Sequence, residues 1–259
     1  MERLQSDERW PAEGGSDLLW EENSRRMIPL YDNVPTRRFP VMTVALIVAC
    51  IAVWIAELLA PAFGLSQGRL FFEAGTVPYE ITNRVDVVPD DPIPWWVGLF
   101  TSMFLHGGWL HLIFNMLFLW IFGNNVEDTM GRLRFLVFYL LCGLVAALAQ
   151  VAIDPQSMTP TIGASGAIAG VLGAYFVLFP RARVLSLIPL FIVFPVVLIP
   201  AWVLLLVWFG WQLIQGLAAL GAQTEVAFFA HIGGFAAGAL LVWVFTTPAS
   251  RRRRVVPRW

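Results

Sequence analysis

The chain contains no lysine, only two cysteines and three histidines, and charged residues make up 14% of its 259 positions. A soluble globular domain carries roughly a quarter charged residues. Hydrophobic residues account for 58% of the chain, and the mean hydropathy is +0.70. This composition excludes a soluble globular domain and predicts a protein that crosses the membrane several times.

The scarcity of cysteine and histidine also limits the chemistry. Cys50 and Cys142 both fall inside apolar stretches, where thiols are expected to pack rather than to form a disulfide. The sequence has no Cys/His spacing typical of zinc. One imidazole and one carboxamide, from His111 and Asn115, also fall short of the usual three protein ligands. We therefore expect no metal site.

Six apolar stretches are candidates for transmembrane helices, which need about 20 apolar residues to cross a hydrocarbon core about 30 Å thick. They are 41–60, 107–122, 135–153, 163–179, 199–220 and 226–245. The stretch 185–198 is also apolar, but Pro189 and Pro195 interrupt it. We interpret it as an interfacial or re-entrant approach to the fifth span, with a seventh crossing as the alternative. The predicted fold is an all-α bundle of six transmembrane helices.

The arginines predict the orientation, because basic residues gather in cytoplasmic loops. With six spans and a cytoplasmic N-terminus, the arginines of 25–38, 132–134, 181–183 and 251–254 all lie inside, whereas acidic residues dominate the outer loops. A seventh crossing would place the last group outside. We expect a polar cytoplasmic leader at 1–40, a transmembrane domain at 41–247 and a basic cytoplasmic tail at 248–259, in the plasma membrane.

Nucleophilic and ionisable side chains inside apolar spans are costly in hydrocarbon and indicate a functional site. Ser165 begins the fourth span, and His231 lies near the start of the sixth. His111 and Asn115 are four residues apart and share one face of the second. These three spans run from outside to inside. At 1.5 Å per residue, their polar groups lie in one layer roughly 10 Å below the outer surface.

Small residues explain how a serine and a histidine on different helices come together. The small-residue faces consist of Ser165, Ala169 and Gly173 in the fourth span and His231, Gly234 and Gly238 in the sixth. Such faces let helices approach closely in lipid, as a hydrogen bond of about 2.6–3.2 Å between nucleophile and base requires. We predict a dyad in which His231 acts as general base and then as general acid, without an orienting aspartate.

The tetrahedral intermediate of such a reaction carries an oxyanion that needs donors placed in advance. The candidates are the amide of Ser165, at a helix N-terminus whose dipole favours negative charge, and the side chains of His111 and Asn115. His106 points about 140° away from His111 on a helix, so we expect it to have a structural hydrogen-bonding role.

Each of these features also has a plain structural explanation. Small residues are common at helix contacts, and a lone intramembrane histidine more often ties helices together or relays protons. His111 with Asn115 is compatible with a simple bridge between helices. Their joint occurrence in one layer, on helices that pack tightly, favours a hydrolase whose site opens to the outer face.

Taken together, the residues resemble the rhomboid family of intramembrane serine proteases. Three segments are similar to its signatures, in the same order: His106-x4-His111-x3-Asn115, Gly163-Ala164-Ser165-Gly166 and Ala230-His231-Ile232-Gly233-Gly234. The segment 127–131, Glu-Asp-Thr-Met-Gly, also resembles a turn of that family. The resemblance covers roughly residues 27–247.

The resemblance implies that Ser165 is the nucleophile, His231 the base, and His111 and Asn115 with the local amides of Ala164 and Ser165 the oxyanion hole. The residues expected to support the site are His106, Gly163, Gly166, Gly234 and Gly238. It further implies cleavage of other membrane proteins in or near their transmembrane segments, without a cofactor. Ala169 stands where some members carry a tyrosine that stacks on the histidine, so the packing that orients His231 must come from elsewhere.

Two other classes of function stay open at this point. A catalytically silent relative that binds transmembrane helices would lack Ser165 or His231, and both are present. A transporter or channel would need polar groups along a path across the bilayer, whereas here they stop in the outer half. The expected partners are transmembrane protein substrates and the lipid bilayer. We interpret the arginines of 251–254 as a contact with anionic lipid rather than with nucleic acid.

Overall fold

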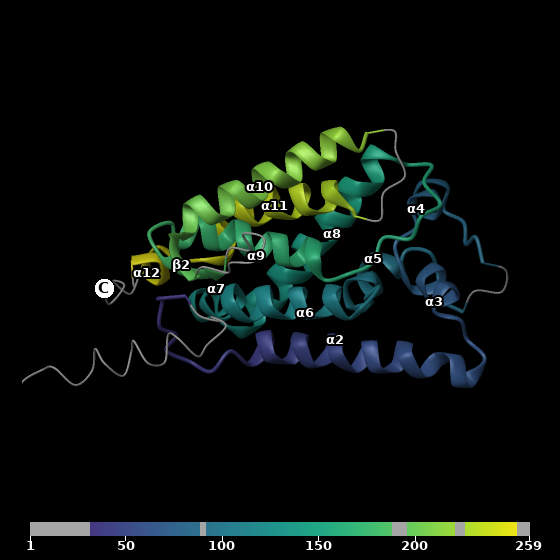
Figure 1. Ribbon diagram of the computed structural model, residues 1–259, viewed down its shortest axis with the longest axis horizontal. Helices are drawn as coiled ribbons and strands as arrows, with labels where there is room; N and C mark the ends of the chain where they lie inside the picture. The colour runs from purple at the N-terminus through teal and green to yellow at the C-terminus, as the bar shows by residue number, and fades with distance from the viewer. Residues whose placement is uncertain (1–31, 89–91, 188–195, 221–225, 253–259) are drawn as a thin grey trace, which may run out of the picture.

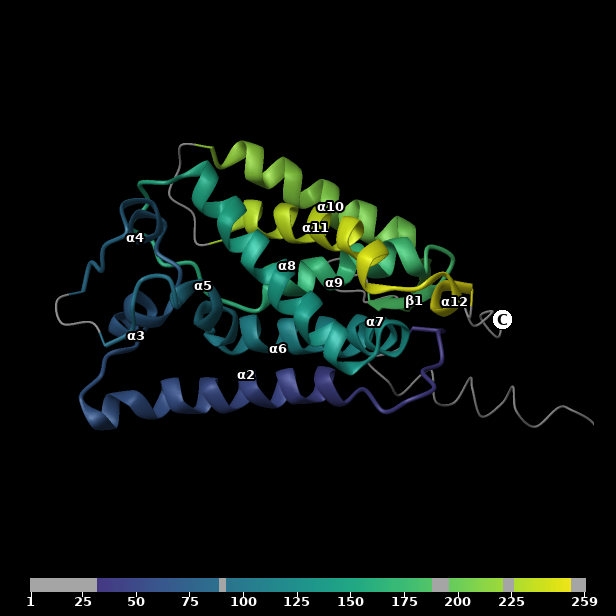
Figure 2. The ribbon, with the colours of Figure 1, turned by 180° about the vertical axis from the view of Figure 1, so that it is seen from behind.

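The computed structural model describes residues 32–88, 92–187, 196–220 and 226–252, and it shows a bundle of helices that run along one common direction (Figures 1 and 2). Most of the expected leader and part of the expected tail, residues 1–31 and 253–259, lie outside the described residues. Short helices α3, α4 and α5 gather at one end of the bundle. Helices α7 (Asn124–Met130) and α12 (Pro248–Arg252) and strand β2 (Val196–Pro200) gather at the other (Figure 1).

Five helical segments of the described chain are long and apolar enough to cross a membrane. They are Val41–Phe63, containing α2 (Val41–Leu59) and η1 (Ala60–Phe63); Trp109–Met130, containing α6 (Trp109–Phe118), the π-helical η3 (Leu119–Gly123) and α7 (Asn124–Met130); α8 (Arg132–Ile153); α10 (Ala201–Ala218); and α11 (Phe228–Phe245). The polytopic helical fold agrees with the prediction from sequence.

The remaining expected span, 163–179, the fourth in the chain, is shorter than predicted. It forms α9 (Ser165–Leu178), a helix of 14 residues, which at 1.5 Å per residue is about 21 Å long. Gly163 precedes it with φ +116, outside the helical region, and Pro180 follows it, disfavouring helical backbone at Phe179. These two residues limit α9 to four turns.

Helix α9 lies in the middle of the bundle, between α11 and α6 and in contact with α8 (Figures 1 and 2). Eleven of its residues are buried. Glycine permits this packing: a Cβ on Gly234 would overlap the carbonyl oxygen of Gly166, and a Cβ on Gly238 would overlap that of Gly170. The backbones of α9 and α11 therefore touch directly, as the small-residue faces predict.

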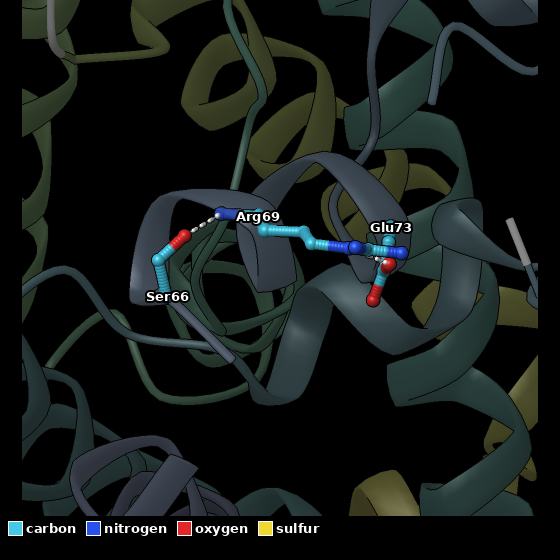
Figure 3. A network of polar contacts seen from close by, with 3 residues as sticks. All are labelled: Ser66, Arg69 and Glu73. Carbon is cyan, nitrogen blue, oxygen red and sulfur yellow. Dashed lines mark hydrogen bonds and ion pairs between the residues drawn. The ribbon is translucent and has the colours of Figure 1, made fainter. Parts of the chain in front are cut away.

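The segment between α2 and α6 forms three short helices: α3 (Gln67–Ala74), α4 (Pro78–Asn83) and α5 (Gly98–Thr101). Helix α3 is capped by Ser66, whose Oγ accepts a hydrogen bond of 3.2 Å from the amide of Arg69. The guanidinium of Arg69 in turn donates to Glu73 one turn later, at 2.5 Å (Figure 3). These local bonds stabilise α3 at the end of the bundle where α9 begins.

The apolar stretch 185–198 returns on itself instead of crossing. Its described parts belong to β1 (Arg183–Leu187) and β2 (Val196–Pro200), which pair antiparallel with Leu185 opposite Leu198. Residues 188–195 lie outside the described residues. Because the two ends of the stretch are hydrogen-bonded neighbours, the alternative of a seventh crossing is wrong.

The N-terminus of α2 is capped by a carboxylate from another helix. Glu127 of α7 is buried and accepts hydrogen bonds from the amides of Met42 and Thr43, at 3.0 and 2.8 Å, and from the Thr43 hydroxyl at 2.8 Å. A carboxylate at a helix N-terminus satisfies orphan amides and complements the helix dipole. This contact explains structurally why the acidic turn at 127–131 follows the second span.

Residues 32–34, which the sequence suggested were part of a polar leader, are buried against the transmembrane domain. The amide of Asn33 donates to the carbonyl of Arg183, at 3.1 Å, so the segment lies beside β1. The Asp32 carboxylate accepts hydrogen bonds from Asn125, at 2.6 Å, and from the hydroxyl of Tyr175. Residues 32–34 of the expected leader therefore pack against the helices of the bundle.

Burial raises the pKa of Asp32 to about 6, although its hydrogen bonds oppose part of this effect. The folded state then binds one more proton than the unfolded state between pH about 4 and 6, so stability rises as pH falls through this window, by at most about 3 kcal/mol. We expect Asp32→Asn to remove this component. Thermal unfolding in detergent, from pH 7 to 4.5, measures it; equal pH slopes for the two proteins would contradict it.

Candidate active site

Ser165 is the first residue of α9, and the turn before it is fixed by contacts with distant segments. The amide of Gly163 donates to the carbonyl of Ser102, at 2.8 Å, and Thr161 pairs with Thr76. The Thr76 hydroxyl also lies 3.0 Å from that of Ser102. Thr76 and Ser102, which belong to the segment between α2 and α6, thus hold the loop that precedes Ser165. The side chain of Ser165 is half-buried.

His231 lies in the first turn of α11, and its Nε2 is 2.8 Å from Ser165 Oγ. The two side chains come from helices in direct backbone contact through Gly166 and Gly234. The distance is within the range of a hydrogen bond between a nucleophile and its base. The structure therefore brings together the two residues expected to form the dyad.

The other imidazole nitrogen of His231 also has a partner, which the sequence reasoning missed. Nδ1 lies 2.8 Å from Oε1 of Gln212 on α10, and the ring of Trp208 lies 5.9 Å from the imidazole, centroid to centroid. Gln212 had the same signal as the residues that were found, a polar side chain inside an apolar span. Unlike Asn115, which shares a helix face with His111, Gln212 has no histidine on its own helix, so no local pattern indicated its role.

His111 and Asn115, on α6, converge on the turn before Ser165. A Cβ on Gly163 would lie 2.6 Å from His111 Cε1, 2.7 Å from its Nε2 and 3.8 Å from Asn115 Nδ2. Asn115 is buried, and its Nδ2 has no hydrogen-bond partner among the described residues. Buried amide donors are normally paired. A free donor here, beside the serine, is suited to a group that arrives with a substrate.

His106 stands apart from the dyad. Its amide donates to Glu57 of α2, at 3.1 Å, and its Nδ1 lies 3.1 Å from the carbonyl oxygen of Phe104. Burial, with a smaller effect of neighbouring His111, lowers the pKa of His106 to about 4. A neutral, fully buried ring with these partners supports the loop before α6 and packs edge-on against His111, with ring centroids 5.3 Å apart.

Both cysteines are free and buried, as expected from their apolar surroundings. Within the described residues, no group of three histidine, cysteine or acidic side chains is placed to hold a metal ion. The polar groups gathered at the site are the hydroxyl of Ser165, the imidazoles of His231 and His111, the carboxamides of Gln212 and Asn115, and the amides at the start of α9.

Comparison with known proteins shows the family of the chain. Residues 94–248 match the family model of the Rhomboid domain. The mitochondrial Rhomboid protein 1 of Saccharomyces cerevisiae is 33% identical over 168 residues, 61% of this chain and 44% of that protein. The Rhomboid protease GluP of Bacillus subtilis is 46% identical over 80 residues, 31% of this chain and 15% of that protein.

RHOMBOID-like protein 1 of Arabidopsis thaliana is 32% identical over 154 residues, 57% of this chain and 34% of that protein. The chain thus spans less than half the length of these curated relatives. The family match covers more than half of the chain, however, and includes the segments that carry His111, Ser165 and His231. The chain belongs to the rhomboid family.

Proposed function

We propose that this protein is an intramembrane serine endopeptidase that cleaves peptide bonds in or near the transmembrane segments of other membrane proteins. The observation that supports it most strongly is the 2.8 Å contact between Ser165 Oγ and His231 Nε2. A serine hydroxyl is a weak nucleophile unless an adjacent base takes its proton. This pair supplies both groups inside a membrane-spanning domain.

In the proposed reaction, Ser165 Oγ attacks the carbonyl carbon of the scissile bond while its proton passes to His231 Nε2. The resulting oxyanion is stabilised by the free donor of Asn115, by His111, and by backbone amides at Ala164 and Ser165 at the start of α9. His231 then protonates the leaving amine, and the carbon–nitrogen bond breaks. In the second half, His231 takes a proton from the water that attacks the acyl-enzyme carbonyl, and it returns the proton to Ser165 Oγ as the carboxylic acid product leaves. No cofactor takes part.

The orientation follows from the charged residues at the two ends of the bundle. The described arginines at 37, 38, 132, 134, 181, 183 and 251 belong to segments beside α7, β1 and α12 (Figures 1 and 2), whereas two, Arg69 and Arg84, belong to the segment of α3 and α4 at the other end. By the preference of arginine for cytoplasmic loops, the end with α7 and α12 faces the cytoplasm together with both termini. The site then opens to the outer face of the plasma membrane. We propose transmembrane proteins and the bilayer as partners, and no nucleic acid.

The experiment that tests this function uses the full chain in lipid nanodiscs and a fluorophosphonate probe, which reacts only with activated serines. We expect one adduct per chain, mapped by peptide mass spectrometry to Ser165, and loss of cleavage of a synthetic transmembrane substrate in step with labelling. An adduct on another serine would contradict the assignment of Ser165 as the nucleophile. A folded protein that neither reacts nor cleaves would favour a silent helix-binding member of the family.

A further inference from the structure

Gln212 is a buried amide in the middle of an otherwise apolar helix. It is 8% exposed, and its Oε1 contacts His231 Nδ1, while Ser165 Oγ contacts the other nitrogen of the same ring. Helix α10 carries one more amide, Gln215, and no charged or hydroxyl-bearing residue. A buried amide without a hydrogen bond is costly. The hydrogen bond between Gln212 and His231 therefore stabilises the buried amide, and the same bond holds the imidazole.

We propose that Gln212 is the positioning residue of His231, in the role that an aspartate takes in many serine hydrolases; this rests on the function proposed above. A neutral imidazole carries one proton, on either nitrogen. Only the ring protonated at Nδ1 leaves Nε2 free to accept the proton of Ser165. The carbonyl oxygen of Gln212 accepts a hydrogen bond and cannot donate one. It therefore selects this tautomer and fixes the rotation of the ring.

A neutral acceptor fits a site within the membrane. An ionised carboxylate at this depth would be buried without a matching cation, which is strongly unfavourable. The amide dipole of Gln212 is directed at Nδ1 without carrying a charge. It also stabilises the imidazolium that forms when Ser165 attacks, because Nδ1 keeps its proton and its acceptor throughout the reaction.

Trp208 provides a second constraint on the ring. It precedes Gln212 by four residues, so the two side chains share one face of α10, and its ring lies at 39° to the imidazole plane. A Cβ added at Gly234 of α11, three residues after His231, would lie 3.3 Å from the Cβ of Ala169 on α9. Helix α9 holds the nucleophile, α11 holds the base, and α10 orients the base.

The test compares Gln212→Met with Gln212→Glu in the full chain in nanodiscs. Methionine has a similar size but no carbonyl acceptor, whereas a glutamate that burial keeps protonated retains a carbonyl oxygen that accepts a hydrogen bond. The matched control is Gln215→Met, which removes the other amide of α10. We expect Gln212→Met to lower kcat by about 10- to 100-fold with KM changed by less than about threefold, Gln212→Glu to stay within about fivefold, and the control to behave as wild type.

A second measurement does not depend on activity. With only three histidines in the chain, nitrogen NMR of isotope-labelled imidazoles identifies His231 once His106 and His111 are assigned by substitution. We expect Nδ1 of His231 to be protonated and Nε2 to be bare in the wild type, and the two tautomers to become mixed in Gln212→Met.

Two results would overturn the positioning role: a tautomer and kcat unchanged in Gln212→Met, or a Gln212→Glu variant as impaired as Gln212→Met. A wild type that shows the Gln212-dependent tautomer but no reactive serine would instead refute the proposed function and leave the positioning role intact.

Discussion

Ser165→Ala, His231→Ala and the double variant are expected to lower the kcat for a transmembrane substrate by the same factor, about 10⁶-fold. The two side chains act as one unit through their 2.8 Å contact. Without the base the hydroxyl is not activated, and without the hydroxyl the base has nothing to activate. Removing the second residue therefore costs nothing further, although oxyanion donors on α6 remain.

Cleavage of a fluorescent transmembrane substrate in nanodiscs, at equal amounts of folded protein, measures the effect. Ser186→Ala is the matched control, since Ser186 lies in β1 and bonds only the nearby carbonyl of Val184. Two results would show that the pair does not form the catalytic unit. One is a double variant whose loss of kcat is the product of the two single losses, and the other is a His231→Ala variant that keeps a tenth of the wild-type kcat.

Gly238→Ala is expected to destabilise the fold by about 3 kcal/mol or more, or to prevent folding. The added Cβ overlaps the backbone carbonyl of Gly170, which is part of a helix and cannot turn aside. Helices α9 and α11 must separate, and a displacement of about 1 Å at the dyad costs about 100-fold in rate. Stability and activity should therefore fall together.

The control for this substitution is Gly210→Ala on α10, where an added Cβ meets no atom within 4 Å. Alanine is the better helix former by about 1 kcal/mol, so this variant should be neutral or slightly more stable. Unfolding in mixed micelles measures both variants. A Gly238→Ala protein as stable as Gly210→Ala would contradict the direct backbone contact between α9 and α11.

Much of the site was predictable because the bilayer makes polar residues conspicuous. Ser165, His231, His111 and Asn115 each interrupt an apolar stretch, and the direction of their spans indicated a common depth. The close approach of α9 and α11 followed from glycine spacing, and the structure places the predicted dyad within hydrogen-bonding distance. These predictions needed only local pattern and helix geometry.

What the sequence did not reveal depends on contacts between distant segments. Nothing near Gln212 shows that its amide meets His231, since that depends on how α10 packs against α11. The burial of Asp32 depends on Tyr175, which lies 143 residues later in the chain. Likewise, hydropathy does not reveal that Leu185 pairs with Leu198 across β1 and β2. From hydropathy alone, a seventh crossing stayed an alternative for this stretch.

The brevity of α9 has a consequence for how deep the chemistry takes place. Hydrophobic matching constrains helices that face lipid, whereas α9 is surrounded by protein on all sides and is exempt from that constraint. The length of α9, about 21 Å, is roughly 9 Å less than the thickness of a 30 Å hydrocarbon core. We infer that a helix this short places the nucleophile below the level at which the longer helices around it end. The length of one internal helix, rather than the shape of any loop, then sets the level in the membrane at which a bond is cut.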